Sequence, residues 1–148
     1  SQNYYKMTTP LPKLLQSEAI VRFQHCDPLG HLNNSMYIDY LLNAREDQLS
    51  QHYGLDIYNH ARETGRAWVV ASHQLQYKRP VSAMQRVTIS SSLKGYNDKS
   101  LQVYFEMKVA DQLCCTMETS FVYIDVKSGR PVDHGETLIA LFEQIRLP

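Results

Sequence analysis

The sequence predicts an α+β fold in which a curved antiparallel sheet of five strands wraps around one central buried helix, with a second helix near the C-terminus. Three observations carry this prediction. A helix that is apolar on almost every side follows the first strand. Four segments with apolar residues at every second position come next, and an amphipathic segment closes the chain. Because one sheet has to cover a helix that is buried all round, the sheet has to curl.

The first part of the chain supplies one strand and the buried helix. Residues 1–16 are expected to form a loose arm, and residues 18–26 alternate as a strand. The period changes at Asn34, from which the chain is apolar almost all round until a polar run at residues 45–48. Gly54 is the expected C-cap of this helix.

The rest of the chain supplies the sheet. The four alternating segments span residues 67–78, 86–94, 101–109 and 113–125. The turns at residues 95–98 and 110–112 are typical of hairpins, so these strands are expected as neighbours in a meander. Residues 137–145 form the final helix. The outer sheet face still carries Tyr, Val and Met and is expected to need cover from another copy of the chain. One domain over residues 1–148 is predicted.

Composition excludes several classes of partner. Lys+Arg and Asp+Glu number 15 each, so no net field attracts nucleic acid or anionic lipid. No apolar run approaches the ~20 residues of a membrane span. Residues 1–13 lack the apolar region of a signal peptide. The cysteines are Cys26, Cys114 and Cys115, an odd number with two adjacent, which favours free thiols and a cytoplasmic location.

The strongest chemical signal is the segment of residues 27–37. Asp27 is expected to end the first strand, a Pro-Gly turn follows, and two asparagines open the helix. The first N–H groups of a helix lack intrahelical partners and stabilise developing negative charge. A carboxylate beside such an oxyanion site is what acyl transfer to water requires. The alternative is that Asp27 is a turn or cap residue, since Asp-Pro favours turn initiation.

The element order and this motif together resemble the hotdog-fold thioesterases. The similarity is greatest to the 4-hydroxybenzoyl-CoA thioesterase and YbgC-like acyl-CoA thioesterase branch, with a second likeness to acyl-ACP thioesterases. It covers roughly residues 18–123 and also rests on the aromatic-basic-proline turn at residues 77–81. The resemblance implies hydrolysis of an acyl-CoA thioester to free acid and CoA by a homodimer or homotetramer. It implies no cofactor, because coenzyme A is part of the substrate.

The resemblance also implies roles for individual residues. Asp27 corresponds to the catalytic carboxylate, as general base or as nucleophile. The backbone N–H of Asn34 corresponds to the group that polarises the thioester carbonyl. His31 corresponds to a histidine that orders the loop, and its alternative is a loop histidine satisfied by the backbone. The candidate substrate-binding residues are Tyr37, Trp68, His73, Lys78 and Arg79. The alternatives are that Tyr37 is a core residue and that Lys78 and Arg79 are the basic residues of an exposed strand end.

Some family features are absent, and other functions stay open. The acyl-ACP branch has an asparagine where this chain has Leu29 and a glutamate where it has Gln76. Acyl carrier protein therefore remains only an alternative partner, and Glu46 on the helix is the alternative carboxylate. A non-catalytic acyl-binding module is a further alternative. The spacing around His25 matches no standard zinc pattern, so no metal is predicted.

Overall fold

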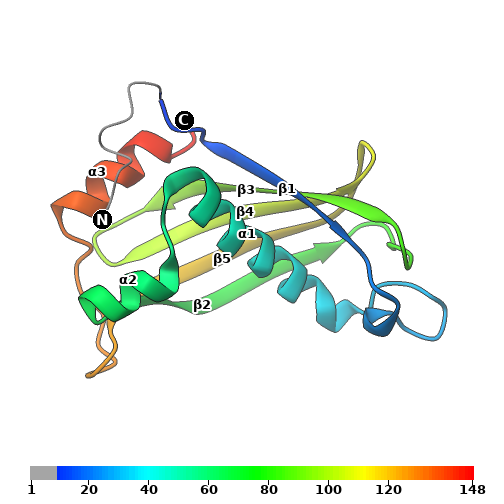
Figure 1. Ribbon diagram of the computed structural model, residues 1–148, viewed down its shortest axis with the longest axis horizontal. Helices are drawn as coiled ribbons and strands as arrows, with labels where there is room; N and C mark the ends of the chain where they lie inside the picture. Colours follow the sequence, from blue (N-terminus) through cyan, green and yellow to red (C-terminus); the bar gives the residue numbers. More distant parts are fainter. Residues whose placement is uncertain (1–9) are drawn as a thin grey trace.

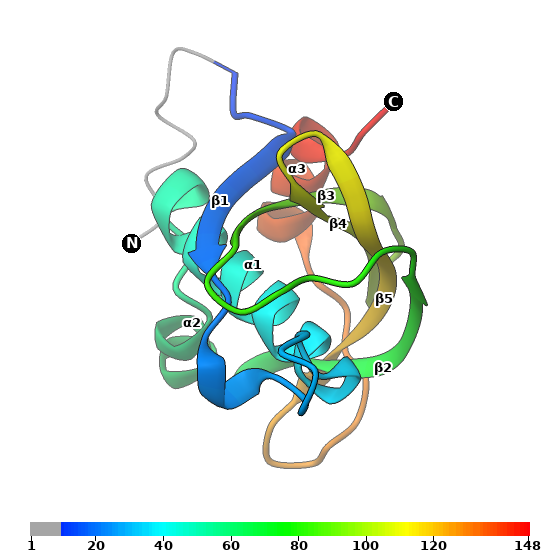
Figure 2. The same cartoon turned by 90° about the vertical axis from the view of Figure 1, so that its right-hand side faces the viewer.

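The computed structural model describes residues 10–148, and its sheet has the strand order β1-β3-β4-β5-β2 with every pairing antiparallel. The strands are β1 (Leu14–Ile20), β2 (Arg66–Tyr77), β3 (Arg86–Tyr96), β4 (Ser100–Val109) and β5 (Gln112–Asp125). The helices are α1 (Tyr37–Tyr53), α2 (Ile57–Thr64) and α3 (Glu136–Ile145). The sheet curves around α1, which lies across its concave face (Figure 1 and Figure 2). The predicted curved sheet with a central helix is confirmed.

Helix α1 begins and ends where its local sequence dictates. Asn33 caps a short 3₁₀ turn (Asn34–Met36) that leads into the helix, because its side chain accepts a hydrogen bond from the Ser35 N–H at 3.0 Å. Gly54 ends the helix with φ +64°, a left-handed conformation that a glycine adopts without strain. None of residues 10–148 belongs to a helix that is long and apolar enough to cross a membrane.

Two members of the polar run at residues 45–48 lie in the core, which the sequence pattern alone does not indicate. Arg45 and Gln48 are buried at 7% and 0% exposure. Their i, i+3 spacing places them near the inward face that carries Leu41 and Ala44. Both side chains hydrogen-bond to β3, Arg45 to the Ser91 hydroxyl and Gln48 to the Ile89 carbonyl.

The first strand differs from its prediction. It runs over Leu14–Ile20 instead of residues 18–26, and a 3₁₀ turn (Phe23–His25) follows. The arm predicted for residues 1–16 lies partly outside the described residues, and from Leu14 onward the prediction is wrong. Leu15 is 1% exposed and pairs with Ser91 of β3. Asp27 therefore lies in a loop beyond the strand rather than at its end.

The predicted meander is confirmed for β3, β4 and β5, but β2 is placed elsewhere. It pairs with β5 at the far edge of the sheet, opposite to β1. The loop of residues 78–85 carries the chain across the end of the sheet, from β2 to β3 (Figure 1). The second long side of β2 consequently has no partner strand within residues 10–148.

Along β4 the outer face of the sheet is polar, and the cover expected from another copy of the chain stays a prediction. Val103, Phe105 and Met107 point inward and are almost fully buried. The residues that alternate with them on β4 are Gln102, Tyr104 and Glu106. Across from these, Glu118 of β5 forms an ion pair with Lys94. An alternating strand places its apolar half on the core, and water covers the other half.

Candidate active site

Asp27 lies in a tight loop that it holds together itself. Its Oδ1 atom accepts hydrogen bonds from the backbone N–H groups of Leu29 at 2.9 Å and His31 at 3.0 Å. Its own backbone closes the loop through a 2.7 Å bond to the His31 carbonyl and a 2.9 Å bond from the Gly30 N–H. No hydrogen bond to Oδ2 occurs among the described residues. One carboxylate oxygen thus fixes the turn, and the other remains available for chemistry.

Neighbouring segments fix the position of this loop. Cys26 and Leu32 pair across its base, and the Asn33 N–H donates to the His25 carbonyl at 2.9 Å. These pairings bring the Asp27 turn next to the start of the 3₁₀ segment. The β2–β3 loop buttresses the other side, since the Leu32 N–H donates to the Val81 carbonyl at 2.7 Å. The same backbone hydrogen bonds therefore hold the Asp27 loop and the start of the helix in place.

The helix start leaves one donor available. The Ser35 N–H is bonded to the Asn33 side chain, and the Met36 N–H is bonded to the Asn33 carbonyl at 2.8 Å. The N–H of Asn34, by contrast, has no acceptor within the part of the chain that the structure describes. Its carbonyl accepts a hydrogen bond from the Tyr77 hydroxyl at 2.9 Å, which fixes the orientation of this segment against β2. Such a donor is suited to a developing oxyanion.

Several predicted substrate-binding residues gather at this same end. Tyr37 is 2% exposed and packs edge-to-face on Tyr77, with 5.1 Å between ring centroids. Burial raises the pKa of Tyr37 to about 12, so this phenol stays protonated. Lys78 and Arg79 directly follow, both exposed, and their backbone N–H groups donate to the Cys114 carbonyl. Both residues begin the β2–β3 loop, in which Ser82 pairs with His31 of the Asp27 loop. His31 reaches Asp27 through its backbone N–H.

Trp68 and His73 are not brought to this end. Trp68 lies nine positions before Tyr77 on β2, which at ~3.3 Å per residue separates them by roughly 30 Å. Its indole N–H donates to His134 Nε2 at 3.0 Å. His73, between the two, bonds through Nδ1 to the Thr119 hydroxyl at 2.8 Å. Within one protomer, neither side chain belongs to the Asp27 site.

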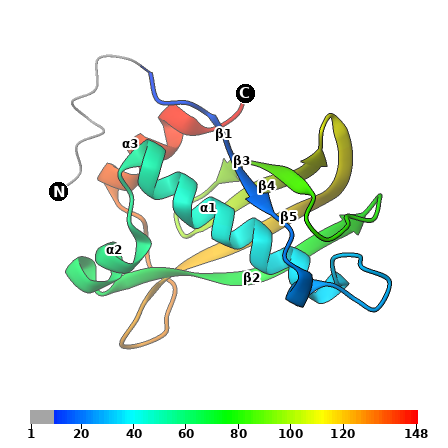
Figure 3. The same ribbon diagram turned by 45° about the vertical axis from the view of Figure 1, so that its right-hand side comes forward.

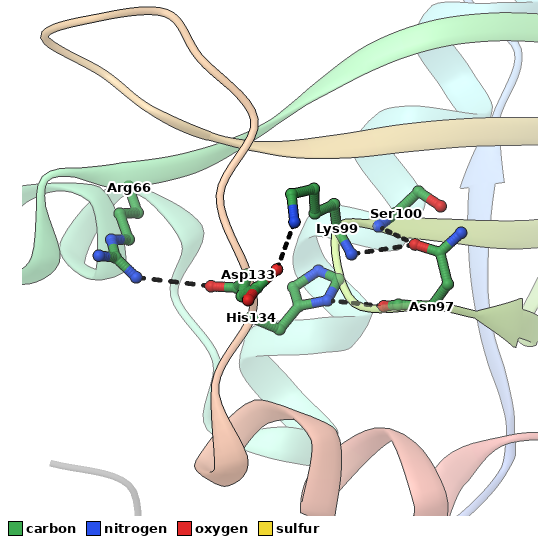
Figure 4. Close-up of polar contacts among 6 residues, drawn as sticks. All are labelled: Arg66, Asn97, Lys99, Ser100, Asp133 and His134. Atoms are coloured by element: carbon green, nitrogen blue, oxygen red, sulfur yellow. Dashed lines mark hydrogen bonds and ion pairs between the residues drawn. The ribbon is translucent and has the colours of Figure 1, made fainter.

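A cluster of histidines surrounds Trp68. His60 stacks on the indole at 5.0 Å, and His134 receives its N–H. The other nitrogen of His134 therefore carries the proton, which it donates to the Asn97 carbonyl at 3.1 Å (Figure 4). Lys99 pairs with the neighbouring Asp133 at 2.5 Å. Burial lowers the pKa of both histidines, so they are neutral near pH 7. This cluster ties the loop before α3 to the sheet.

An apolar cavity of about 440 Å³ opens beside Trp68, and sequence reasoning did not find it. It lies between α1, α2, α3 and the inner face of the sheet. Its walls include Leu49, Leu101, Phe121 and Leu141. The alternating pattern marks these residues as core, and nothing in a linear pattern indicates which core positions leave a space between them. Glu46, the alternative carboxylate, also lines this cavity rather than the Asp27 loop.

The residues described here do not assemble a metal site. No group of three or more His, Cys, Asp and Glu side chains in residues 10–148 is placed to hold an ion. The three cysteines of the chain are unpaired. The available chemistry at the helix start is therefore that of a carboxylate, a backbone donor and nearby cations.

A curved sheet around one helix, with an acid just before the helix start, defines a hotdog-fold hydrolase. Comparison with protein families gives a match to the thioesterase-like superfamily over residues 21–141. The chain belongs to this superfamily and is a thioester hydrolase.

Individual relatives agree with this assignment. The chain is 30% identical over 118 residues to the long-chain acyl-CoA thioesterase FadM of Escherichia coli, covering 78% of this chain and 87% of FadM. It is 32% identical over 130 residues to an L-carnitine dehydrogenase/betainyl-CoA thioesterase of Agrobacterium fabrum, covering 86% of this chain but 26% of that longer protein. The crystal structure of YbaW, a probable thioesterase from E. coli, superposes with a TM-score of 0.76 at 27% identity, over 89% of this chain and 99% of YbaW.

Proposed function

We propose that this protein hydrolyses acyl-CoA thioesters to the free acid and CoA, with Asp27 and the Asn34 N–H acting on the thioester carbonyl. The observation that carries the proposal is that both groups adjoin the same loop. Asp27 has one carboxylate oxygen without a hydrogen bond, and the Asn34 N–H has no acceptor among the described residues. The similarity to FadM, named a long-chain acyl-CoA thioesterase, supports the choice of substrate class.

The chemistry follows from these two groups. The carbonyl oxygen accepts a hydrogen bond from the Asn34 N–H, which stabilises the negative charge that forms when the carbon is attacked. Asp27 Oδ2 either removes a proton from an attacking water or attacks the carbon itself to give a mixed anhydride that water then opens. In both routes the C–S bond breaks, and the CoA thiolate leaves and takes up a proton. His31 acts by fixing Asp27 Oδ1 through its backbone.

The free edge of β2 supports a homodimer. Two copies pairing along this edge about a two-fold axis place Tyr77 of one protomer next to Arg66 of its partner, because antiparallel strands meet end to end. Trp68 and its apolar cavity in one protomer then border the Asp27 loop of the other. The acyl chain enters the partner's cavity, and Lys78 and Arg79 hold the phosphates of CoA.

Two features support a cytoplasmic location. The thiols Cys26, Cys114 and Cys115 are all free, which is typical of a reducing compartment. The net charge of the whole chain is zero, so no general attraction to nucleic acid or to an anionic membrane surface is expected. Coenzyme A is the substrate's own carrier group, and the proposed reaction uses no cofactor.

A thiol-release assay tests the proposed reaction. The purified protein is incubated with acyl-CoAs of several chain lengths, and free CoA is measured with a thiol reagent. Asp27→Asn is expected to lower kcat/KM by about 10²–10⁴, the range for loss of a general base. The matched control Asp39→Asn alters an exposed acid in the first turn of α1 and is expected to retain activity. Acyl-CoA binding without CoA release would contradict the proposal and favour a non-catalytic acyl-binding module. Hydrolysis of acyl thioesters of acyl carrier protein but not of CoA would identify acyl carrier protein as the substrate's carrier.

Subunit complementation tests the shared site. Leu101→Trp fills the cavity in one variant, and Asp27→Asn disables the loop in another. If each site combines the loop of one protomer with the cavity of its partner, a heterodimer of the two variants has one intact site and regains activity. Sites confined to single protomers would leave both inactive. Sedimentation is expected to give roughly twice the 17.1 kDa chain mass.

A further inference from the structure

The cavity beside Trp68 is enclosed at its base and opens between α1 and α2. Leu93, Val103 and Leu141 at its base are between 0% and 2% exposed. Tyr58 at its mouth is 60% exposed and faces Glu46 across the gap between the two helices, and this carboxylate raises the pKa of the phenol. The C-terminal end of α1 lies with α2 and α3 at this end of the sheet (Figure 3). A volume of about 440 Å³ falls in the range of small-molecule pockets, ~300–1,000 Å³.

A buried guanidinium lines this apolar space. Arg45 is 7% exposed, and its Nη1 donates to the Ser91 hydroxyl at 2.9 Å. The Ser91 hydroxyl donates its own hydrogen bond to Gln48 Oε1, and Gln48 donates in turn to the Ser17 hydroxyl and to the Ile89 carbonyl. Every group in this chain beyond Arg45 is neutral. Arg45 forms no ion pair with any acidic side chain in residues 10–148.

The surroundings of Arg45 do not compensate its charge. A guanidinium carries five N–H donors, and one of them is engaged by Ser91. Tyr53 lies close, but its hydroxyl donates to the Pro12 carbonyl at 2.6 Å and stays protonated, since burial raises its pKa to about 12. Burial lowers the pKa of Arg45 to about 10, which still leaves it charged near pH 7. A buried charge without a counter-charge is unfavourable unless a ligand supplies one.

We propose that the cavity binds an aliphatic chain that ends in a carboxylate and that Arg45 holds this carboxylate. The planar guanidinium fork matches a carboxylate, and the leucine and phenylalanine walls match the methylene chain. Two kinds of molecule have this chemistry. The first is a free fatty acid that enters the cavity with its carboxylate leading. The second is a CoA thioester of a dicarboxylic acid, whose acyl chain ends in a free carboxylate, and this candidate rests on the proposed function because its chain enters from the catalytic loop of the partner.

Calorimetric binding tests the proposal without turnover. Dodecanoate and dodecanol, each below its aggregation concentration, have equal chains and differ in charge. The wild-type protein is expected to bind the acid at least tenfold more tightly than the alcohol. Arg45→Met, which replaces the buried charge by an apolar side chain of similar length, is expected to remove this preference while binding of the alcohol persists. The matched control Arg62→Met, on the exposed face of α2, is expected to keep it.

Equal affinity of the wild-type protein for acid and alcohol overturns the proposal, whether or not Arg45→Met folds. Retention of the preference in folded Arg45→Met, shown by circular dichroism, also overturns it. Hydrolysis assays then show which molecule supplies the carboxylate. If kcat/KM is tenfold higher for the CoA monothioester of dodecanedioic acid than for dodecanoyl-CoA, Arg45 binds the free end of the substrate's acyl chain. If the two rates are equal and dodecanoate inhibits, Arg45 binds a free fatty acid. Acid binding without hydrolysis of any acyl-CoA refutes the proposed function and supports the carboxylate site.

Discussion

Two substitutions separate the loop hydrogen bonds of Asp27 from the catalytic role proposed for it. Its Oδ1 accepts two backbone N–H bonds, from Leu29 and His31, whereas Oδ2, the proposed reactive atom, accepts none from the described residues. Asp27→Ala removes both hydrogen bonds at a half-buried position. At about 0.5–1.5 kcal/mol for each bond, the free energy of unfolding should fall by about 1–3 kcal/mol. Asp27→Asn keeps an amide oxygen in the Oδ1 position, so its stability should stay within about 0.5 kcal/mol of the wild type.

Urea unfolding at one fixed protein concentration measures this difference, since subunit association makes stability concentration-dependent. In a thermal scan each kcal/mol lowers the Tm of a chain of this length by about 2–4 °C. Asp111→Ala, which removes an exposed acid from the β4–β5 turn, is the control and should be neutral. Both Asp27 variants should lose activity, but only Asp27→Ala should lose stability. An Asp27→Ala protein as stable as Asp27→Asn refutes the assignment of Oδ1 to the turn.

Three further perturbations test the framework around the site. Burial lowers the pKa of His60 and His134 below the ordinary value of about 6.5, so below that pH the unfolded chain binds more protons than the folded chain. The free energy of unfolding should therefore be fully retained above about pH 6.5 and decline as the pH falls below it; a flat profile in urea contradicts this. Gly54→Ala forces a side chain into φ +64° and should destabilise the protein by about 1 kcal/mol, with no change in thermal unfolding as the contrary result. Tyr77→Phe removes the hydroxyl bonded to the Asn34 carbonyl and should lower stability by about 0.5–1.5 kcal/mol; unaltered urea unfolding would show that this bond contributes nothing.

The periodicity of the sequence predicted most elements, because burial on one face leaves a regular imprint. The strand around residues 101–109 was placed to within one residue. The position of β2 could not be predicted, since its pattern is the same whether its partner is β3 or β5. The first strand was misplaced because residues 22–26 continue the alternation of polar and apolar side chains, although the backbone there turns. Pairing between distant segments decides both cases, and a local pattern does not contain it.

The candidate site was predictable only where its parts are close in sequence. The segment of residues 27–37 is such a case, because the turn, the caps and the helix start are consecutive. Arg45 is the opposite case: it stands in a polar run, and only the curvature of the sheet around α1 buries it beside Ser91. The apolar cavity near Arg45 has the same origin. It depends on how α2 and α3 approach the sheet.

The length of β2 explains why the predicted substrate-binding residues fall into two groups. Tyr37, Lys78 and Arg79 lie at one end of this strand, and Trp68 lies roughly 30 Å away at the other. Within one protomer the catalytic loop and the apolar cavity therefore lie at opposite ends of β2. If two copies pair along the free edge of β2 about a two-fold axis, the loop end of one protomer lies beside the cavity end of the other. In the proposed homodimer, a complete site therefore depends on the exposed edge of β2, and the same pairing covers an edge that is otherwise prone to aggregation.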